Sequence, residues 1–352
     1  MDRKPLIYDL DYEALQSALE ALGEPAYRAR QVWQGLYVNL WRSPDEFTNL
    51  PLGLRRKLGE SFSFSHLDPV VVLDSQDQET RKTLFRLPDE QAIEAVLMRY
   101  EKRRTLCIST QAGCAMGCVF CATGQMGFRR NLSSGEIVEQ VVHYARLLKD
   151  QGQQVTNVVV MGMGEPFHNY DGTMQAIERL NHPEGFNLGS RRFTVSTVGL
   201  VPMIRRFARE RRQINLAVSL HASDDELRGS MLPVNRKYPV EELLQACLEY
   251  VEATHRRITF EWALIRDVND TPEQARLLGS RLQAFRRDGA TLCHVNVIPL
   301  NPTQKYPGQA TTAERARAFQ AELEKMGIPC TIRIRRGIDI QAGCGQLAVQ
   351  SQ

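Results

Sequence analysis

The sequence predicts an α/β fold: an open, partial barrel of six strand–helix units, preceded by a small helical domain and a short β-extension. After residue 105 of the 352-residue chain, apolar runs typical of strands alternate with amphipathic helical patterns, the order that gives a parallel sheet covered by helices. The units number six, too few to close an eight-stranded barrel. The predicted domains are therefore 1–65, 66–104 and 105–352.

The first 65 residues carry the pattern of short helices. Asp11 can cap a helix that runs to Leu22, and Gly23 lies just past its end. Further helical stretches are expected at 27–37, 43–46 and 52–58. Four aromatic residues are expected in the core of this region: Tyr27, Trp33, Tyr37 and Trp41.

Short apolar runs separated by polar turns predict strands from about residue 69 onward. The strands of the β-extension are expected at 70–73, 82–86 and 93–99. The barrel strands are expected at 105–109, 155–161, 193–197, 214–221, 258–265 and 293–299, with a last strand at 331–335. The helices between them are expected from Ser133 onward and at 171–180, 201–211, 240–255, 271–285 and 312–326. Functional residues are expected at the carboxyl ends of these strands, where such folds hold their ligands.

The composition is that of a soluble globular protein, with 43% hydrophobic and 24% charged residues. No apolar stretch approaches the ~18 residues of a membrane helix, and no secretory signal is recognised, so a cytoplasmic location is expected. Basic and acidic residues nearly balance, 44 against 41, but 36 of the basic residues are arginines. Pairs such as Arg103-Arg104, Arg129-Arg130 and Arg205-Arg206 suit either phosphate contacts or solvated helix faces.

Three of the eight cysteines lie close together after the first barrel strand. Cys114, Cys118 and Cys121 have the spacing CxxxCxxC. Three thiolates on one loop can bind three irons of a cubane cluster and leave the fourth iron open to chelate a ligand. A structural zinc site normally has four ligands, and a ferredoxin-type cluster has a fourth cysteine. Incidental cysteines, or a zinc site with Cys107 as fourth ligand, remain alternatives at this point.

A second motif, Met161-Gly162-Met163-Gly164-Glu165-Pro166, follows the next strand, and its glycines allow the backbone to approach a ligand closely. Together the two motifs resemble those of the radical S-adenosylmethionine (SAM) superfamily. The resemblance implies a [4Fe–4S] cluster that binds the methionine end of SAM and cleaves its sulfonium to a 5′-deoxyadenosyl radical. It implies the same partial barrel of six units, and contacts from Gly164 and Glu165 to the cofactor.

Longer strings resemble one family within that superfamily, the RlmN dual-specificity RNA methyltransferases that act on carbon 2 of adenine. The Cfr-like carbon-8 methylases share almost all of these strings, so this alternative stays open. The strings are Cys107-Ile108-Ser109-Thr110-Gln111-Ala112-Gly113-Cys114, Ser219-Leu220-His221-Ala222, Ile298-Pro299-Leu300-Asn301-Pro302 and Arg336-Gly337-Ile338-Asp339-Ile340-Gln341-Ala342-Gly343-Cys344-Gly345-Gln346-Leu347.

The RlmN resemblance implies roles for two further cysteines. Carbon 2 of adenine is electron-poor and has no lone pair, so it does not attack a sulfonium methyl directly. The family solves this with two SAM molecules per turnover. Cys344 takes a methyl group from the first, and a radical made from the second activates that methyl group, which then adds to the ring. Cys107 is expected to resolve the adduct by removing the ring proton, by forming a disulfide with Cys344, or by both. The remaining Cys247, Cys293 and Cys330 are expected in the core.

Other site residues are carried over from the same resemblance. Glu94, a lone acid in an apolar strand, matches the family's proton acceptor. The residues expected to contact SAM are Gly164, Glu165, Ser196, Ser219, Leu220, His221 and Asn301.

The implied RNA partners are 23S rRNA and tRNA. The target in 23S rRNA is an adenosine of the peptidyl transferase region, and the target in tRNA is the adenosine after the anticodon. The resemblance also implies an electron donor such as flavodoxin or ferredoxin. The resemblance further implies that the helical domain 1–65 is of the RNA-binding type. A monomer without membrane contact is expected. Two competing functions remain: a radical enzyme with a small-molecule substrate, and a zinc-stabilised RNA-binding protein without catalysis.

Overall fold

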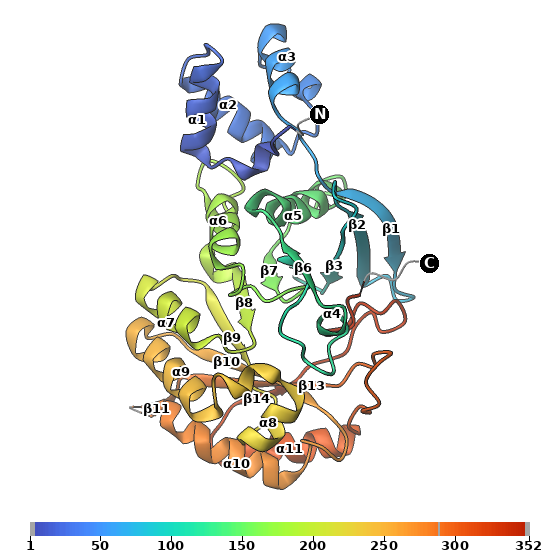
Figure 1. Ribbon diagram of the computed structural model, residues 1–352, viewed down its shortest axis with the longest axis vertical. Coiled ribbons are helices and arrows are strands. Elements are labelled where there is room, and N and C mark those ends of the chain that lie inside the picture. Colours follow the sequence, from blue (N-terminus) through green and yellow to red (C-terminus); the bar gives the residue numbers. More distant parts are fainter. Residues whose placement is uncertain (1–3, 288, 349–352) are drawn as a thin grey trace.

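The computed structural model describes residues 4–287 and 289–348 and confirms the predicted α/β fold (Figure 1). Its main sheet consists of β1 (Asp68–Asp74), β2 (Thr80–Arg86), β3 (Ala92–Arg99), β4 (Arg104–Cys107), β7 (Asn157–Val160), β8 (Phe193–Thr197), β9 (Asn215–Ser219), β10 (Ile258–Leu264), β13 (Cys293–Pro299) and β14 (Cys330–Ile332). The strands lie side by side in this order. Neighbours from β1 to β4 are antiparallel, and neighbours from β4 to β14 are parallel.

All six predicted strand–helix units are present, and β14 adds a further parallel strand beside β13. The helices of the units are α5 (Ser134–Lys149), α6 (Tyr170–Asn181), α7 (Val201–Glu210), α9 (Val240–Thr254), α10 (Pro272–Leu282) and α11 (Ala313–Lys325). A short helix α8 (Asp225–Met231), which the sequence analysis did not predict, lies before α9. The Asp224 side chain caps it by accepting a hydrogen bond from the Leu227 amide (2.8 Å).

The N-terminal helices α1 (Tyr12–Ala21), α2 (Tyr27–Gln34) and α3 (Leu52–Ser61) lie at one end of the molecule, beyond α5 and α6 (Figure 1). Asp9 joins this region to the barrel, because its Oδ1 accepts a hydrogen bond from the Gly135 amide (2.7 Å). Arg146 of α5 donates to the carbonyls of Leu40 and Trp41.

Two details of the helical region differ from the prediction. The second helix was expected to reach Tyr37, but from Gly35 to Asn39 it continues as a wider π-type turn, and Leu40 then adopts a left-handed conformation. Trp33 and Tyr37 are buried as predicted, whereas Tyr27 is 59% exposed, so its assignment to the core was wrong. Tyr27 stands at the first turn of α2, where its ring lies against the guanidinium of Arg28 instead of the core.

The cysteine motif lies within a local structure that was not predicted. The strand expected at 105–109 ends at Cys107, because the chain then turns into a hairpin of β5 (Gln111–Gly113) and β6 (Phe128–Asn131). This hairpin encloses the cysteine loop and the single-turn helix α4 (Ala122–Gln125). The remaining strand pair, β11 (Arg286–Arg287) with β12 (Ala290–Thr291), lies away from the site.

The β-extension continues the barrel sheet directly, because β3 pairs with β4 and places Val96 opposite Cys107. Within the described part of the chain, no helix is both long enough and apolar enough to cross a membrane.

Candidate active site

A cavity of about 1000 Å³, counted with its open mouth, lies at the carboxyl ends of the parallel strands. This is the position expected from the fold. Most of the predicted site residues meet in its wall, although they come from six separate segments of the chain. Those that line it are Cys114, Cys118, Cys121, Gly164, Glu165, Ser196, Ser219, His221, Asn301 and Cys344.

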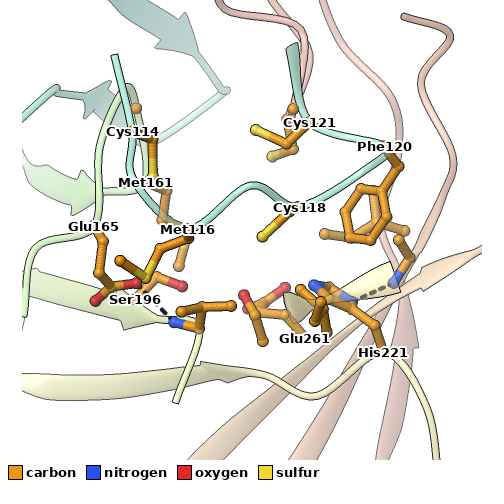
Figure 2. Close-up of a pocket in the computed structure, with 18 of the residues that line it drawn as sticks. Cys114, Met116, Cys118, Phe120, Cys121, Met161, Glu165, Ser196, His221 and Glu261 are labelled. Atoms are coloured by element: carbon orange, nitrogen blue, oxygen red, sulfur yellow. Dashed lines mark hydrogen bonds between the residues drawn. The ribbon is translucent and has the colours of Figure 1, made fainter. Parts of the chain in front are cut away.

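The three motif cysteines lie along one loop, across the cavity from Ser196 and Glu261 (Figure 2). Cys114 is buried, and Cys118 and Cys121 are half-buried. Burial raises the pKa of the Cys114 thiol to about 12. Burial and the neighbouring Cys121 and Cys114 raise the pKa of Cys118 as well. These thiols would ionise only with positive charge beside them, which a metal centre supplies.

The spacing of these thiols bears on which metal centre fits. Within residues 4–287 and 289–348, no group of three or more His, Cys, Asp or Glu side chains could hold a metal ion as the side chains stand. A zinc ion draws its thiolates together at about 2.3 Å from one centre. A cubane is instead bonded at separate iron corners. Three thiols on one loop supply three corners of such a cluster, whereas a structural zinc site normally has four protein ligands.

The Gly164-Glu165 turn faces the cysteine loop. Gly164 has φ +101°, and a Cβ atom there would stand 2.6 Å from Gln111, so no other residue fits this position. Glu165 is buried, and its carboxylate accepts hydrogen bonds from the amides of Val198 (2.8 Å) and Phe167 (2.9 Å). Burial raises its pKa to about 7. The side chain thus joins the loops after β7 and β8, and the turn is held rigid beside the cavity.

His221 forms another part of the wall, at the end of β9. Its Nδ1 accepts a hydrogen bond from the Ala263 amide (2.9 Å), so the ring proton resides on Nε2. Burial, with Arg228 nearby, lowers its pKa to about 3, and the ring stays neutral. The ring meets Phe120 edge to face, with centroids 5.1 Å apart. Leu220 does not line the cavity; its side chain is buried in the core.

Cys344 is exposed at the rim, on a loop held by the barrel. Asn301 donates a hydrogen bond to its carbonyl (3.0 Å), and the Ala122 amide donates to the carbonyl of Gly345 (2.8 Å). Enclosure by the surrounding groups raises the pKa of the Cys344 thiol, and the positive charge of Arg333 opposes that rise.

A second, smaller hollow adjoins the main cavity, and Cys344, Asn301 and Arg333 line both. Cys107 lies in the wall of this second hollow, at the end of β4. Burial raises its pKa to about 12. Both cysteines are free thiols in the structure, so the two side chains share a hollow without a disulfide.

Glu94 lies apart from both hollows. Its carboxylate pairs with Lys82 (3.0 Å) and accepts a hydrogen bond from the Ala348 amide (3.0 Å). Burial raises its pKa, and Lys82 opposes that rise.

Comparison with known proteins identifies the family to which the chain belongs. The profile of the radical SAM superfamily matches residues 108–277, and that of the ribosomal RNA large subunit methyltransferase N-terminal domain matches residues 7–63. The chain is 52% identical to the probable dual-specificity RNA methyltransferase RlmN of Chloroflexus aurantiacus, over 97% of this chain and 92% of the relative. It is 49% identical to the dual-specificity RNA methyltransferase RlmN 1 of Myxococcus xanthus, over 98% and 95%.

The chain belongs to the RlmN family of RNA methyltransferases.

A solved structure agrees with this assignment. The crystal structure of a radical SAM methyltransferase from Sphaerobacter thermophilus matches with a TM-score of 0.94 and 50% identity, over 97% of this chain and 99% of that chain. The hydrogenase maturase HydG of Carboxydothermus hydrogenoformans, 16% identical with a TM-score of 0.50 over 66% of this chain and 54% of that chain, shares the fold alone.

Membership in the RlmN family and the radical SAM superfamily implies a [4Fe–4S] cluster and SAM as cofactors. The cavity fits SAM, because two buried acceptor atoms in its wall have no hydrogen-bond partner among the described residues. They are Oε2 of Glu261 and Oδ1 of Asn301. Ammonium, amino and hydroxyl groups of SAM are donors that such acceptors require.

The sequence analysis missed three residues of this RlmN-family site. Glu261 in β10 accepts a hydrogen bond from Asn296 (3.0 Å), and its Oε2 lies 3.8 Å from Arg333. Arg228 is fully buried and donates to the carbonyls of Val198 and Leu220, which ties together the loops after β8 and β9. A lone acid in an apolar strand was a signal for Glu261, whereas nothing local marked Arg228 or Arg333.

Several arginines offered as phosphate contacts have carboxylate partners instead. Arg205 pairs with Glu249 (2.9 Å), and Arg206 pairs with Asp171 (2.6 Å). Arg130 bonds Glu136 (2.7 Å). These ion pairs favour the second alternative, in which these arginines form contacts at the surface and between helices rather than with phosphates.

Proposed function

We propose that this chain methylates carbon 2 of an adenine in RNA and that Cys344 carries the methyl group. The proposed substrates are 23S rRNA, at an adenosine of the peptidyl transferase region, and tRNA, at the adenosine after the anticodon. The single observation that carries the proposal is the position of Cys344. It lies between a cavity that holds the three motif cysteines and a hollow that holds Cys107. Family membership supports the same chemistry.

In this proposal Cys114, Cys118 and Cys121 hold the cluster, and Gly164, Glu165, Ser196, Ser219, His221 and Asn301 form the SAM site, whereas Leu220 packs in the core behind it. When bound, the cluster supplies the electron that cleaves SAM and so provides the radical. The remaining steps fall to residues of the chain. The Cys344 thiolate takes a methyl group from one SAM molecule, and the S-methyl group later loses a hydrogen atom and bonds to the ring carbon.

We further infer that the target adenine enters the second hollow. Its wall contains Cys107 and Cys344, and the ring of Tyr100 lies at its edge with the Arg336 guanidinium 4.4 Å from the ring centroid. An aromatic ring and a planar cation are the surfaces on which an extruded base stacks. Cys107 is then adjacent to the adduct that it has to resolve.

Mass spectrometry of nucleosides tests the proposed function. RNA transcripts are incubated anaerobically with the reconstituted protein, SAM and a low-potential reductant. We expect 2-methyladenosine in rRNA and tRNA fragments that contain the target. Formation of 8-methyladenosine would assign the Cfr-like reaction instead. Iron-free protein with one zinc per chain and no methylated product would favour the zinc-stabilised RNA-binding function.

We also propose a cytoplasmic monomer that receives electrons from a flavodoxin or ferredoxin. The absence of a membrane-spanning helix in the described residues is compatible with this location. Light scattering measures the mass in solution, and replacement of the chemical reductant by reduced flavodoxin tests the donor.

A further inference from the structure

The loop that carries Cys344 is attached at both ends to one buried ion pair. Lys82 of β2 and Glu94 of β3 are 3.0 Å apart, and their side chains are only 9% and 5% exposed. The Lys82 ammonium donates to the carbonyl of Gln341 (3.3 Å), and Glu94 accepts from the amide of Ala348 (3.0 Å). The two bonds bracket residues 341–348, with Cys344 near the middle.

The location of the ion pair relates the loop to Cys107. β3 places Val96 opposite Cys107 of β4, and Glu94 lies two residues from Val96 on the same side of the strand. On the barrel side, Thr123 donates to the carbonyl of Leu347 (2.6 Å) and Asn301 to that of Cys344 (3.0 Å). The segment is thus held between the β-extension and the barrel, and the ion pair is its attachment to the strands that position Cys107.

The energetics argue that the ion pair is kept for position. Removing two charges from water costs several kcal/mol, and apolar residues of similar volume replace many buried ion pairs without loss of stability. An apolar pair could not bond the Gln341 carbonyl and the Ala348 amide, which lie on opposite sides of Cys344. Both acceptor oxygens of Glu94 are already engaged, and neither hollow is lined by this residue.

We propose that Lys82 and Glu94 are positioning residues that hold the Cys344 loop at a fixed place relative to Cys107 and the SAM cavity. This inference rests on the proposed methyl-carrier function of Cys344. It gives Glu94 a role through the loop, in place of the role of proton acceptor that family resemblance implies. The proposal gives the same positioning role to Lys82, for which the resemblance implied no role.

The test compares the full-length holoenzyme with Lys82→Met, Glu94→Gln and the double variant Lys82→Met/Glu94→Leu. Lys57→Met is the matched control, because Lys57 also pairs with a glutamate, Glu24 (2.9 Å), and also donates to a backbone carbonyl, but far from the site. Hydrogen exchange followed by mass spectrometry reports on peptides that contain 341–348. Intact-protein mass under anaerobic conditions, with SAM and no RNA, reports the rate at which Cys344 gains its methyl group.

We expect the double variant to fold with a melting temperature near that of the parent, since an apolar pair replaces the charges. Exchange in 341–348 should rise at least about ten- to a hundredfold, the factor expected from losing even one of its two hydrogen bonds to a charged group. Methylation of Cys344 should slow by a similar factor. Lys82→Met should show part of both effects, and Lys57→Met neither. Glu94→Gln retains an acceptor for the Ala348 amide, so it should stay close to the parent in methylation of Cys344 and release RNA normally.

Two outcomes would overturn the inference. One is a folded double variant whose loop exchange and Cys344 methylation equal those of the parent. The other is a Glu94→Gln protein with normal exchange and normal methylation of Cys344 that accumulates an RNA–protein adduct, because this would identify Glu94 as the proton acceptor. If the parent itself gains no methyl group on Cys344, the proposed function fails, while the exchange measurement still decides whether the ion pair holds the loop.

Discussion

Among the eight cysteines, exposure to solvent distinguishes Cys344. Cys344 is the exposed one, Cys118 and Cys121 are half-buried, and the others are buried. Cys247, Cys293 and Cys330 lie in the hydrophobic core as predicted. The proposed carrier thiol has to reach both a SAM methyl group and an RNA base, and Cys344 lines both hollows.

Substitution of Cys344 by alanine should abolish RNA methylation. The barrel residues that bind SAM are unchanged in Cys344→Ala, so reductive cleavage of SAM should continue. Liquid chromatography of 5′-deoxyadenosine alongside nucleoside mass spectrometry measures the two activities separately. Methylated RNA at the rate of the parent would exclude Cys344 as the carrier.

Substitution of Cys107 should stop the reaction one step later. Cys107→Ala retains the carrier thiol, so the base is attached to Cys344, but the adduct is not resolved. We expect an RNA–protein complex that survives denaturing electrophoresis and contains Cys344 in the cross-linked peptide. Normal turnover without such a complex would argue against a resolving role for Cys107.

The depressed pKa of His221 predicts an acid-side loss of stability. Its pKa is about 3 in the folded chain against 6.5 in the unfolded chain, so only the unfolded state takes up the proton as pH falls below 6.5. At ~1.36 kcal/mol per pH unit once the unfolded histidine is fully protonated, this costs about 2 kcal/mol between pH 6.5 and 4.5.

His221→Asn should remove that part of the pH dependence. Asparagine tolerates the left-handed backbone of this position (φ 60°), and its side-chain oxygen can replace Nδ1 as acceptor for the Ala263 amide. Urea unfolding at both pH values measures the difference. His255→Asn, at an exposed position with the same backbone conformation (φ 53°), is the control for the substitution itself. If the pH dependence of stability is the same in His221→Asn as in the parent, the acid-side loss of stability does not come from His221.

At the scale of elements, the start of α5 connects the site with the N-terminal helices. Ser133 and Glu136 form the capping box expected from the sequence. Glu136 also bonds Arg130 of β6, which fixes the hairpin around the cysteine loop. The first turn of α5 therefore contacts the hairpin around the cysteine loop on one side. On the other side, its Gly135 amide donates a hydrogen bond to Asp9 of the N-terminal region.

Gly135→Ala should loosen the contact between the N-terminal helices and the barrel. A Cβ atom at this position would stand 2.7 Å from the backbone nitrogen of Asp9, and such overpacking costs about 1–3 kcal/mol. We expect a lower melting temperature and weaker RNA binding, with SAM cleavage in the absence of RNA retained. Gly229→Ala in α8, where the nearest atom would be 3.7 Å away, is the control. Equal RNA affinity in both variants would show that the contact is dispensable.

At the scale of the whole molecule, the SAM cavity is built from residues spread between Cys114 and Gly345. Binding of SAM should therefore stabilise the entire barrel. At a concentration 100 times its Kd, a ligand that binds only the folded state adds about 2.7 kcal/mol. Anaerobic differential scanning fluorimetry of the cluster-loaded protein should show a rise in melting temperature of a few degrees. No rise, or an equal rise in a Cys118→Ala protein, would contradict SAM binding at the cluster.

The sequence by itself determined the six strand–helix units and the family, and it predicted the cluster cysteines, because periodic apolar patterns and short motifs are local in the chain. It did not mark Arg228, Arg333 or Lys82, since their roles arise from partners far away in sequence: Arg228 bonds Val198, and Lys82 bonds Glu94 and Gln341. Only the tertiary structure shows that Glu94 accepts a hydrogen bond from the Ala348 amide and lines neither hollow. Those contacts depend on the register of β2, β3 and β4 and on the C-terminal segment, which packs against these strands. Long-range pairing of this kind leaves no pattern in a single sequence.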